Sequence, residues 1–174
     1  MSYNVEMTKL LIDYANKNNI ILELNGNNNK YEYYPLYIAY TKNNTEITKL
    51  LIDYANKNNI ILELNGKYKN GNYPLNVACE HNNFEMVKLI IDYANKNNII
   101  LEMNGKNKNG NYPLLYSYKN NNIKIAKVLI DYANKNDIIL EFNECDIKDI
   151  SKTNSEIIEL LKNFNNINFS GIII

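Results

Sequence analysis

The chain has 174 residues, enough for one or two ordinary domains, and it balances 19 Lys against 19 Asp plus Glu. With zero formal charge, no global field draws it toward nucleic acid or a membrane surface. No stretch approaches the ~18 consecutive apolar residues of a membrane span, and the N-terminus lacks the apolar run of a secretory signal. We therefore expect an intracellular, cytoplasmic protein that does not contact a membrane.

One phrase recurs four times along the sequence. It begins at Asp13 as DYANKNNIILELNG and returns nearly unchanged at Asp53, Asp92 and Asp131, at spacings of 40, 39 and 39 residues. Periods of about 20 to 50 residues are typical of solenoids, in which each unit stacks on the next. Since an active site brings different residues to one point, the repetition favours a stack of structural units over an enzyme.

The first unit begins with a long amphipathic helix at NVEMTKLL, and no short helix precedes it. Either the chain is a piece of a longer array, or this helix acts as a cap. The later long helices carry the same apolar stripe, seen in the third unit at Met86, Leu89, Ile90 and Tyr93, spaced i, i+3, i+4 and i+7.

A shorter segment lies upstream of each later long helix. Pro35, Pro74 and Pro113 each suit the first turn of a short helix, because proline has no N–H to leave unpaired there. The residues HNN or KNNN then predict a turn into the long helix. After the long helix, NIILELNGKYKNGNY predicts an extended loop or hairpin finger, with Gly66 and Gly71 on either side of a polar tip.

The segment NGNYPLNVACEHNNFEMVKLII resembles the ankyrin repeat, whose pattern places Gly, Thr-Pro-Leu-His and Ala before Glu-Ile-Val-x-Leu-Leu-Leu. The matching residues are Gly71, Pro74, Leu75, Ala78, Glu85, Val87 and Leu89. The resemblance covers about residues 4 to 164. It implies an all-α solenoid of ankyrin-type helix-turn-helix repeats joined by extended or hairpin finger loops.

Two departures from the family pattern predict local differences. Tyrosine replaces the family's Thr at residues 34, 73 and 112, so we expect tyrosine stacking in place of the Thr–His hydrogen bond. The unit also exceeds the usual ~33 residues, and the extra residues fall in YANKNN. Ala94 stands where the family ends the helix with Gly. We therefore expect a longer second helix, ended by an Asn such as Asn97 or Asn98 in the left-handed conformation.

We expect a solenoid over residues 1–166, made of a partial repeat 1–26, full repeats 27–66, 67–105 and 106–144, and a closing partial repeat 145–166 with a helix from Glu156 to Phe164. Residues 167–174 form an apolar tail. It either folds back over the last helix or serves as a free C-terminus for a peptide-reading domain. The first is favoured, because an exposed Ile-rich tail is an aggregation hazard.

The sequence predicts no catalytic residue, metal site or cofactor. His81 is the only histidine, and Cys79 and Cys145 stand far apart without a paired motif, so they cannot complete a tetrahedral zinc site. Glu residues 23, 63, 102 and 141 occupy equivalent positions in successive units, so they form a ladder and not a convergent pair. The glycines occur as NG turns and not as a phosphate loop.

In ankyrin-like proteins, contacts come mostly from the finger tips and the exposed side of the short helix. The resemblance therefore implies these partner-binding residues: Lys30, Tyr31, Tyr33, Thr41, Lys42, Lys69, Asn70, Asn72, Glu80, His81, Lys108, Asn109, Asn111, Lys119 and Asn120. Lys outnumbers Glu in this set, and tyrosine is a favoured interface anchor. We expect a protein-binding adaptor or scaffold module whose partner has an acidic surface.

Two other functions stay open. Lys and Tyr on one face also suit single-stranded nucleic acid, although the absence of arginine counts against it. The chain is otherwise a structural spacer, a fragment of a longer repeat protein. We expect a monomer, with self-association through the incomplete first unit as the alternative.

Overall fold

The computed structural model describes residues 2–25, 34–68, 70–142, 156, 159–160 and 167–169. Seven helices occur among these residues: α1 (Ser2–Lys17), α2 (Pro35–Thr41), α3 (Thr45–Lys57), α4 (Pro74–Glu80), α5 (Phe84–Lys96), α6 (Pro113–Lys119) and α7 (Ile123–Lys135). Two short strands follow, β1 (Leu140–Phe142) and β2 (Ile167–Phe169). The all-α repeat solenoid is confirmed, and the two strands are an addition that the sequence did not predict.

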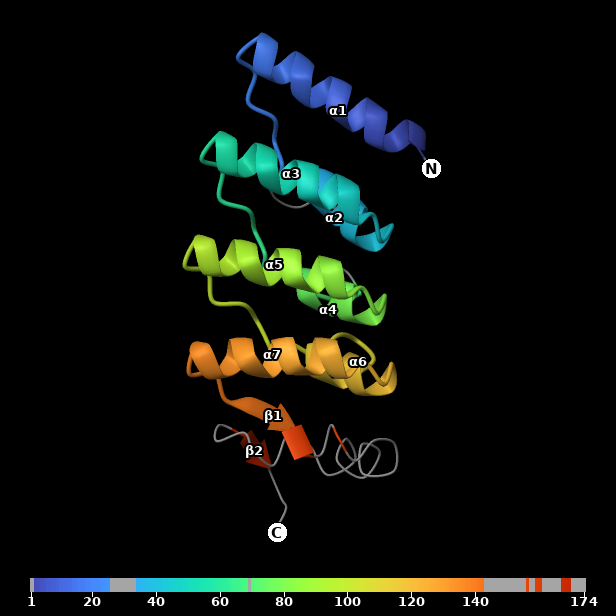
Figure 1. Cartoon of the computed structure of the whole chain (residues 1–174), viewed down its shortest axis with the longest axis vertical. Coiled ribbons are helices and arrows are strands. Elements are labelled where there is room, and N and C mark those ends of the chain that lie inside the picture. The colour runs from blue at the N-terminus through green and yellow to red at the C-terminus, as the bar shows by residue number, and fades with distance from the viewer. Residues whose placement is uncertain are drawn as a thin grey trace.

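The helices form two layers (Figure 1). The long helices α1, α3, α5 and α7 stack one after another along the molecule, and the short helices α2, α4 and α6 stack beside them. Each short helix packs on the long helix of its own unit and on the short helix of the next. The prolines predicted to open the short helices stand at their first residues, which confirms that prediction.

Asparagine begins three of the long helices. Asn44, Asn83 and Asn122 are the N-caps of α3, α5 and α7, and each Oδ1 accepts a hydrogen bond of 3.0 Å from the N–H three residues later. A side-chain acceptor at this position satisfies one of the amide donors that the first helical turn leaves unpaired.

Asparagine also ends the long helices. Helix α5 continues through Ala94 to Lys96, Asn97 is its C-cap, and Asn98 adopts φ 54°. The equivalent positions 19, 59 and 137 have the same left-handed backbone. Asn tolerates this conformation better than most residues with a side chain, so no glycine is needed. The predicted longer second helix and its left-handed Asn are confirmed.

The fingers end in tight hairpin turns. In the third unit, the Tyr68 N–H donates to the Asn72 carbonyl at 2.9 Å, and the Gly71 N–H donates to the Tyr68 carbonyl at 2.7 Å. The fourth unit repeats this arrangement between Asn107 and Asn111, at 2.9 Å. Gly71 adopts φ +81°, a conformation that residues with a Cβ seldom take. These bonds confirm the hairpin form of the finger.

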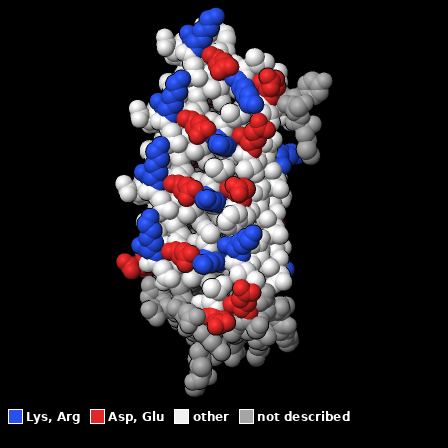
Figure 2. Space-filling model, viewed as in Figure 1, with Lys and Arg blue, Asp and Glu red and all other residues white. Residues whose placement is uncertain are grey.

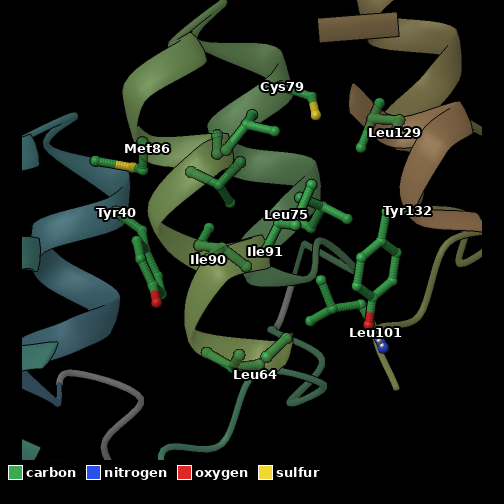
Figure 3. Close-up of a cluster of buried hydrophobic side chains, with 14 of the residues drawn as sticks. Tyr40, Leu64, Leu75, Cys79, Met86, Ile90, Ile91, Leu101, Leu129 and Tyr132 are labelled. Atoms are coloured by element: carbon green, nitrogen blue, oxygen red, sulfur yellow. Dashed lines mark hydrogen bonds between the residues drawn. The ribbon is translucent and has the colours of Figure 1, made fainter. Parts of the chain in front are cut away.

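The core runs without interruption from unit to unit (Figure 3). Each long helix is followed by a return segment, residues 20–22, 60–62, 99–101 and 138–140, which runs toward the next unit. The Tyr93 hydroxyl donates to the Ile60 carbonyl at 2.9 Å and accepts from the Leu62 N–H at 3.1 Å. Tyr54 and Tyr132 bind residues 20–22 and 99–101 in the same way. Each tyrosine therefore clamps the return segment of the preceding unit.

The Thr–His bond of the family has two replacements. Where the second and third units meet, the ring centres of Tyr37 and Tyr68 lie 4.2 Å apart and those of Tyr34 and Tyr37 5.9 Å apart, with the rings tilted by 59° and 45°; the tyrosines are thus in contact as expected, but tilted and not stacked. In the third unit, the Asn76 amide donates to the Gly105 carbonyl at 2.9 Å, so an amide contact replaces the hydroxyl–imidazole contact.

The C-terminal end of the described stack is a two-stranded parallel sheet. Leu140 of β1 pairs with Ile167 of β2, so the first residues of the apolar tail lie against the last return segment. Residues 170–174 and most of the predicted closing helix, 157–158 and 161–164, lie outside the described residues. Among the helices that the structure does describe, none has both the length and the apolar character needed to cross a membrane.

Candidate protein-interaction surface

Finger tips and short-helix ends of the same unit lie side by side. The Asn72 amide donates to a carboxylate oxygen of Glu80 at 3.1 Å, which joins the third unit's tip to the end of α4. In the fourth unit, Lys119 Nζ donates to Asn111 Oδ1 at 2.6 Å. The two regions that the resemblance implied as contact sites therefore form one surface, which we call the tip surface: residues 41, 42, 70, 80, 81, 108, 109, 111, 119 and 120.

Hydrogen bonds also join the tip surfaces of neighbouring units. The Lys108 backbone N–H donates to the Asn70 carbonyl at 3.1 Å, so the third and fourth fingers meet directly. At the helix ends, the Asn120 amide donates to the Cys79 carbonyl at 3.0 Å. These bonds fix the spacing of equivalent side chains, as a surface that reads a partner in register requires.

Asn107 organises the two tips, and the sequence did not identify it. Its Oδ1 accepts from the N–H groups of Asn109 and Asn111 at 2.9 and 3.0 Å. Its amide donates to Asn72 Oδ1 and to the Tyr116 hydroxyl, both at 2.8 Å. The only available signal was an Asn three residues before Gly110, which is weak in so Asn-rich a chain.

Most of the predicted contact residues in the described range are exposed. The exposed ones are Lys42, Asn70, Glu80, His81, Lys108, Asn109, Lys119 and Asn120, and Thr41 and Asn111 are half-buried. Asn72 is only 3% exposed and belongs to the hydrogen-bond network under the tips. Lys30, Tyr31, Tyr33 and Lys69 lie outside the described residues.

Charge differs between the two faces of the stack. Figure 2 shows the long-helix face, where Lys and Asp or Glu side chains alternate in rows. On the tip surface, by contrast, Lys42, Lys108 and Lys119 are accompanied by one carboxylate, Glu80. The Asn72 amide already binds that carboxylate. The tip surface is therefore positive although the whole chain is neutral.

Two further lysines lie over tyrosine rings near the finger bases. Lys67 Nζ is 5.6 Å from the Tyr73 ring centre, and Lys106 Nζ is 5.9 Å from that of Tyr112. A cation over an aromatic face is attracted by the ring quadrupole. These contacts place two more positive charges on the fingers, at positions that the sequence did not single out.

The described ranges give no support for a metal site or for a reactive cysteine. No group of three or more His, Cys, Asp and Glu side chains there is placed to hold a metal ion. Cys79 is fully buried, and burial raises the pKa of its thiol, so it is not a poised nucleophile.

The comparison with family models agrees with this architecture. Residues 58–139 match the family model for ankyrin repeats, in three copies. No curated protein matches the sequence. Among solved structures, the ankyrin repeat protein EF0377 is similar, with 22% identity and a TM-score of 0.47 over 59% of this chain and 46% of that one. The chain thus spans less than half the length of EF0377.

Residues 58–139 are therefore ankyrin repeats, and the described part of the chain has an all-α solenoid fold. Ankyrin repeats generally mediate protein–protein interaction and are typically non-enzymatic.

Proposed function

We propose that this chain is an intracellular adaptor module that binds an acidic segment of a partner protein through the tip surface. The observation that carries the proposal is a set of three exposed lysines: Lys108 and Lys119, whose surroundings are tied together by hydrogen bonds, and Lys42 at the end of α2. Complementary charge of this kind accelerates encounter and selects partners more than it adds affinity.

The rigidity of the tips supports binding. Side chains held in place before association lose less conformational entropy when the partner arrives. Lys119 is already held by Asn111, and the backbone of Lys108 by Asn70. Positive side chains in the second and fourth units suit an extended acidic segment that runs along the stack.

The test compares two triple variants that change the total charge equally. Lys42→Glu, Lys108→Glu and Lys119→Glu reverse the tip surface. Lys49→Glu, Lys88→Glu and Lys127→Glu reverse exposed lysines on the long helices. Fluorescence anisotropy measures the binding of a labelled Glu-rich peptide, and circular dichroism checks that both variants fold.

We expect the tip variant to weaken binding by roughly tenfold or more, and the long-helix variant to change it less than about threefold. Equal losses would mean that binding depends on total charge alone and would contradict the proposed surface. A wild type that binds a Lys-rich peptide as well as the Glu-rich one would contradict the acidic partner. Tighter binding of oligothymidylate, with a steep salt dependence, would favour the nucleic-acid function instead.

A further inference from the structure

We propose that Asn109, at the tip of the fourth finger, deamidates spontaneously and thereby adds a negative charge to the tip surface. Asparagine followed by glycine is the pair most prone to this reaction, because glycine has no Cβ to shield the backbone nitrogen that attacks. Such pairs begin at residues 25, 65, 70, 104 and 109, and the structure describes both members of the last four. The contacts of these four asparagines differ, so they are not equally reactive.

The reaction takes place within one Asn-Gly pair and consumes only water. The Gly110 nitrogen attacks the Asn109 Cγ, an N–C bond forms, and the side-chain amide leaves as ammonia, which carries away the proton of the attacking nitrogen. Water then opens the cyclic imide at either carbonyl, which leaves aspartate or isoaspartate. In sum, one amide and one water become one carboxylate and one ammonium ion. The side chain must rotate freely to reach the nitrogen, so hydrogen bonds to it slow the reaction.

Asn65 and Asn104 are protected, because both ends of each side-chain amide are bound to the next unit. Asn65 Oδ1 accepts from the Glu102 N–H at 2.9 Å, and Asn65 Nδ2 donates to the Ile100 carbonyl at 2.7 Å. Asn104 binds the same two groups one unit later, at 3.1 and 2.8 Å. Both bonds must break before Cγ can approach the following nitrogen. Deamidation at these two residues should therefore be the slowest of the four.

Asn70 is exposed at the tip of the third finger, but its neighbours hold it in place. Its Oδ1 accepts from the Asn72 N–H at 3.0 Å, and its backbone carbonyl accepts from the Lys108 N–H at 3.1 Å. The next finger also crowds the attacking residue, because a Cβ on Gly71 would lie 2.9 Å from the Lys108 nitrogen. Asn70 is therefore protected by one bond to its side chain and by close packing of its backbone.

Asn109 has none of these restraints. The Asn111 N–H donates to Asn107 Oδ1 at 3.0 Å, so the bond that holds the side chain of Asn70 has no equivalent at Asn109. Within the described part of the chain, the exposed Asn109 side chain makes no hydrogen bond, and a Cβ on Gly110 would meet no atom within 4 Å. The Gly110 N–H does donate to the Asn107 carbonyl at 3.0 Å, but the third finger has the equivalent bond at 2.7 Å. Because both tips share that bond, it does not change their order.

The new carboxylate would lie among the lysines of the tip surface. Asn109 directly follows Lys108 in the chain. Its N–H donates to the atom that also binds the Asn111 N–H, and the Asn111 side chain binds Lys119. A negative charge at residue 109 would thus partly neutralise Lys108 and Lys119 and repel an acidic segment. Because the reaction is irreversible, the positive charge of the surface would fall with the age of each molecule.

Mass spectrometry of proteolytic peptides, taken at intervals from the folded chain at neutral pH, follows each pair separately. Asn70 and Asn109 lie in the same local sequence, KNGNYPL, so any difference between their rates comes from the structure. Each hydrogen bond to the side chain should slow the reaction about fivefold, so Asn109 should react about fivefold faster than Asn70 and roughly 20-fold faster than Asn65 and Asn104. In urea, where these contacts are lost, Asn70 and Asn109 should react at equal rates.

An Asn109 that reacts in the folded chain no faster than Asn70, or no faster than Asn65 and Asn104, would overturn the proposal. Gly110→Ala is a second check, because the added Cβ shields the attacking nitrogen. This variant should slow the reaction at Asn109 and leave the rate at Asn70 unchanged. An unchanged rate at Asn109 would mean that the amide is lost without the imide, which would also overturn the proposal.

The effect on binding rests on the proposed function and is tested separately. Asn109→Asp carries the charge of the product, and Asn98→Asp adds the same charge at an exposed position after α5, where the fourth unit has Asp137. In the anisotropy assay with the Glu-rich peptide, Asn109→Asp should bind about threefold more weakly than wild type, and Asn98→Asp within about 1.5-fold. Equal binding by Asn109→Asp and wild type would overturn this effect. A wild type that does not bind the peptide would contradict the proposed function, whereas the order of the reaction rates would still decide the site.

Discussion

Single asparagine residues hold much of this fold together. Asn83 caps α5 through Oδ1, and its amide donates to Asn43 Oδ1 at 2.6 Å and to Thr45 Oγ1 at 2.8 Å. One side chain thus starts a helix and also joins two neighbouring units. Asn98 uses a different property, its tolerance of positive φ, to end the same helix. The abundance of Asn reflects these structural roles as well as composition.

Substitution of Asn83 separates its two contributions. Asn83→Ala removes the cap and both amide bonds, so the free energy of unfolding should fall by about 1–2 kcal/mol. Asn83→Asp keeps an acceptor for the Met86 N–H and places a negative charge at the positive end of the helix, so the loss should stay below about 1 kcal/mol. Urea denaturation of the wild type and of the two variants measures both losses of free energy of unfolding. Equal losses in the two variants would show that the contacts with Asn43 and Thr45 dominate over capping.

At the scale of elements, the sequence predicted those features that are determined by residues close together in the chain. Apolar stripes and first-turn prolines located the helices, and Ala94 in place of the family's Gly predicted a longer helix ended by an Asn, because these signals lie within a few residues of their effect. The β1–β2 pair escaped prediction, because three-residue strands far apart in sequence carry no periodic signal. Asn107 escaped for a related reason. Its structural role depends on the hydrogen bond to Asn72, which lies one unit earlier in the sequence.

The two finger glycines provide a test of contact between neighbouring elements. Gly71 and Gly110 share a positive φ, +81° and +77°. A Cβ on Gly71 would lie 2.9 Å from the Lys108 nitrogen in the next finger, whereas a Cβ on Gly110 would meet nothing within 4 Å. Gly110→Ala should therefore cost only the backbone strain, about 1 kcal/mol, and Gly71→Ala clearly more. Thermal unfolding distinguishes the two. The same loss of stability in both variants would mean that the neighbouring finger moves away from a Cβ at residue 71 without a cost in free energy.

At the scale of the whole molecule, the stack places many tyrosines in its interior. Burial raises the pKa of Tyr40, Tyr68 and Tyr118 well above the usual value, and it raises those of Tyr93 and Tyr132 as well. Burial also raises the pKa of the Cys79 thiol. All these groups are neutral when protonated, so the folded state favours the protonated form more strongly than the unfolded state does.

Stability should therefore fall at alkaline pH. The stabilising effect is fully present below the unfolded-state pKa and is lost as pH rises toward the folded-state pKa. The decline begins near pH ~8.5, where the Cys79 thiol ionises in the unfolded chain, and becomes steep above ~10, where unfolded tyrosines ionise. Urea unfolding at several pH values measures this dependence. In Tyr40→Phe, the slope above pH ~10 should be shallower by up to about 1.4 kcal/mol per pH unit, because one ionising group is gone. Parallel slopes for wild type and variant would show that Tyr40 ionises as readily in the folded chain as in the unfolded one.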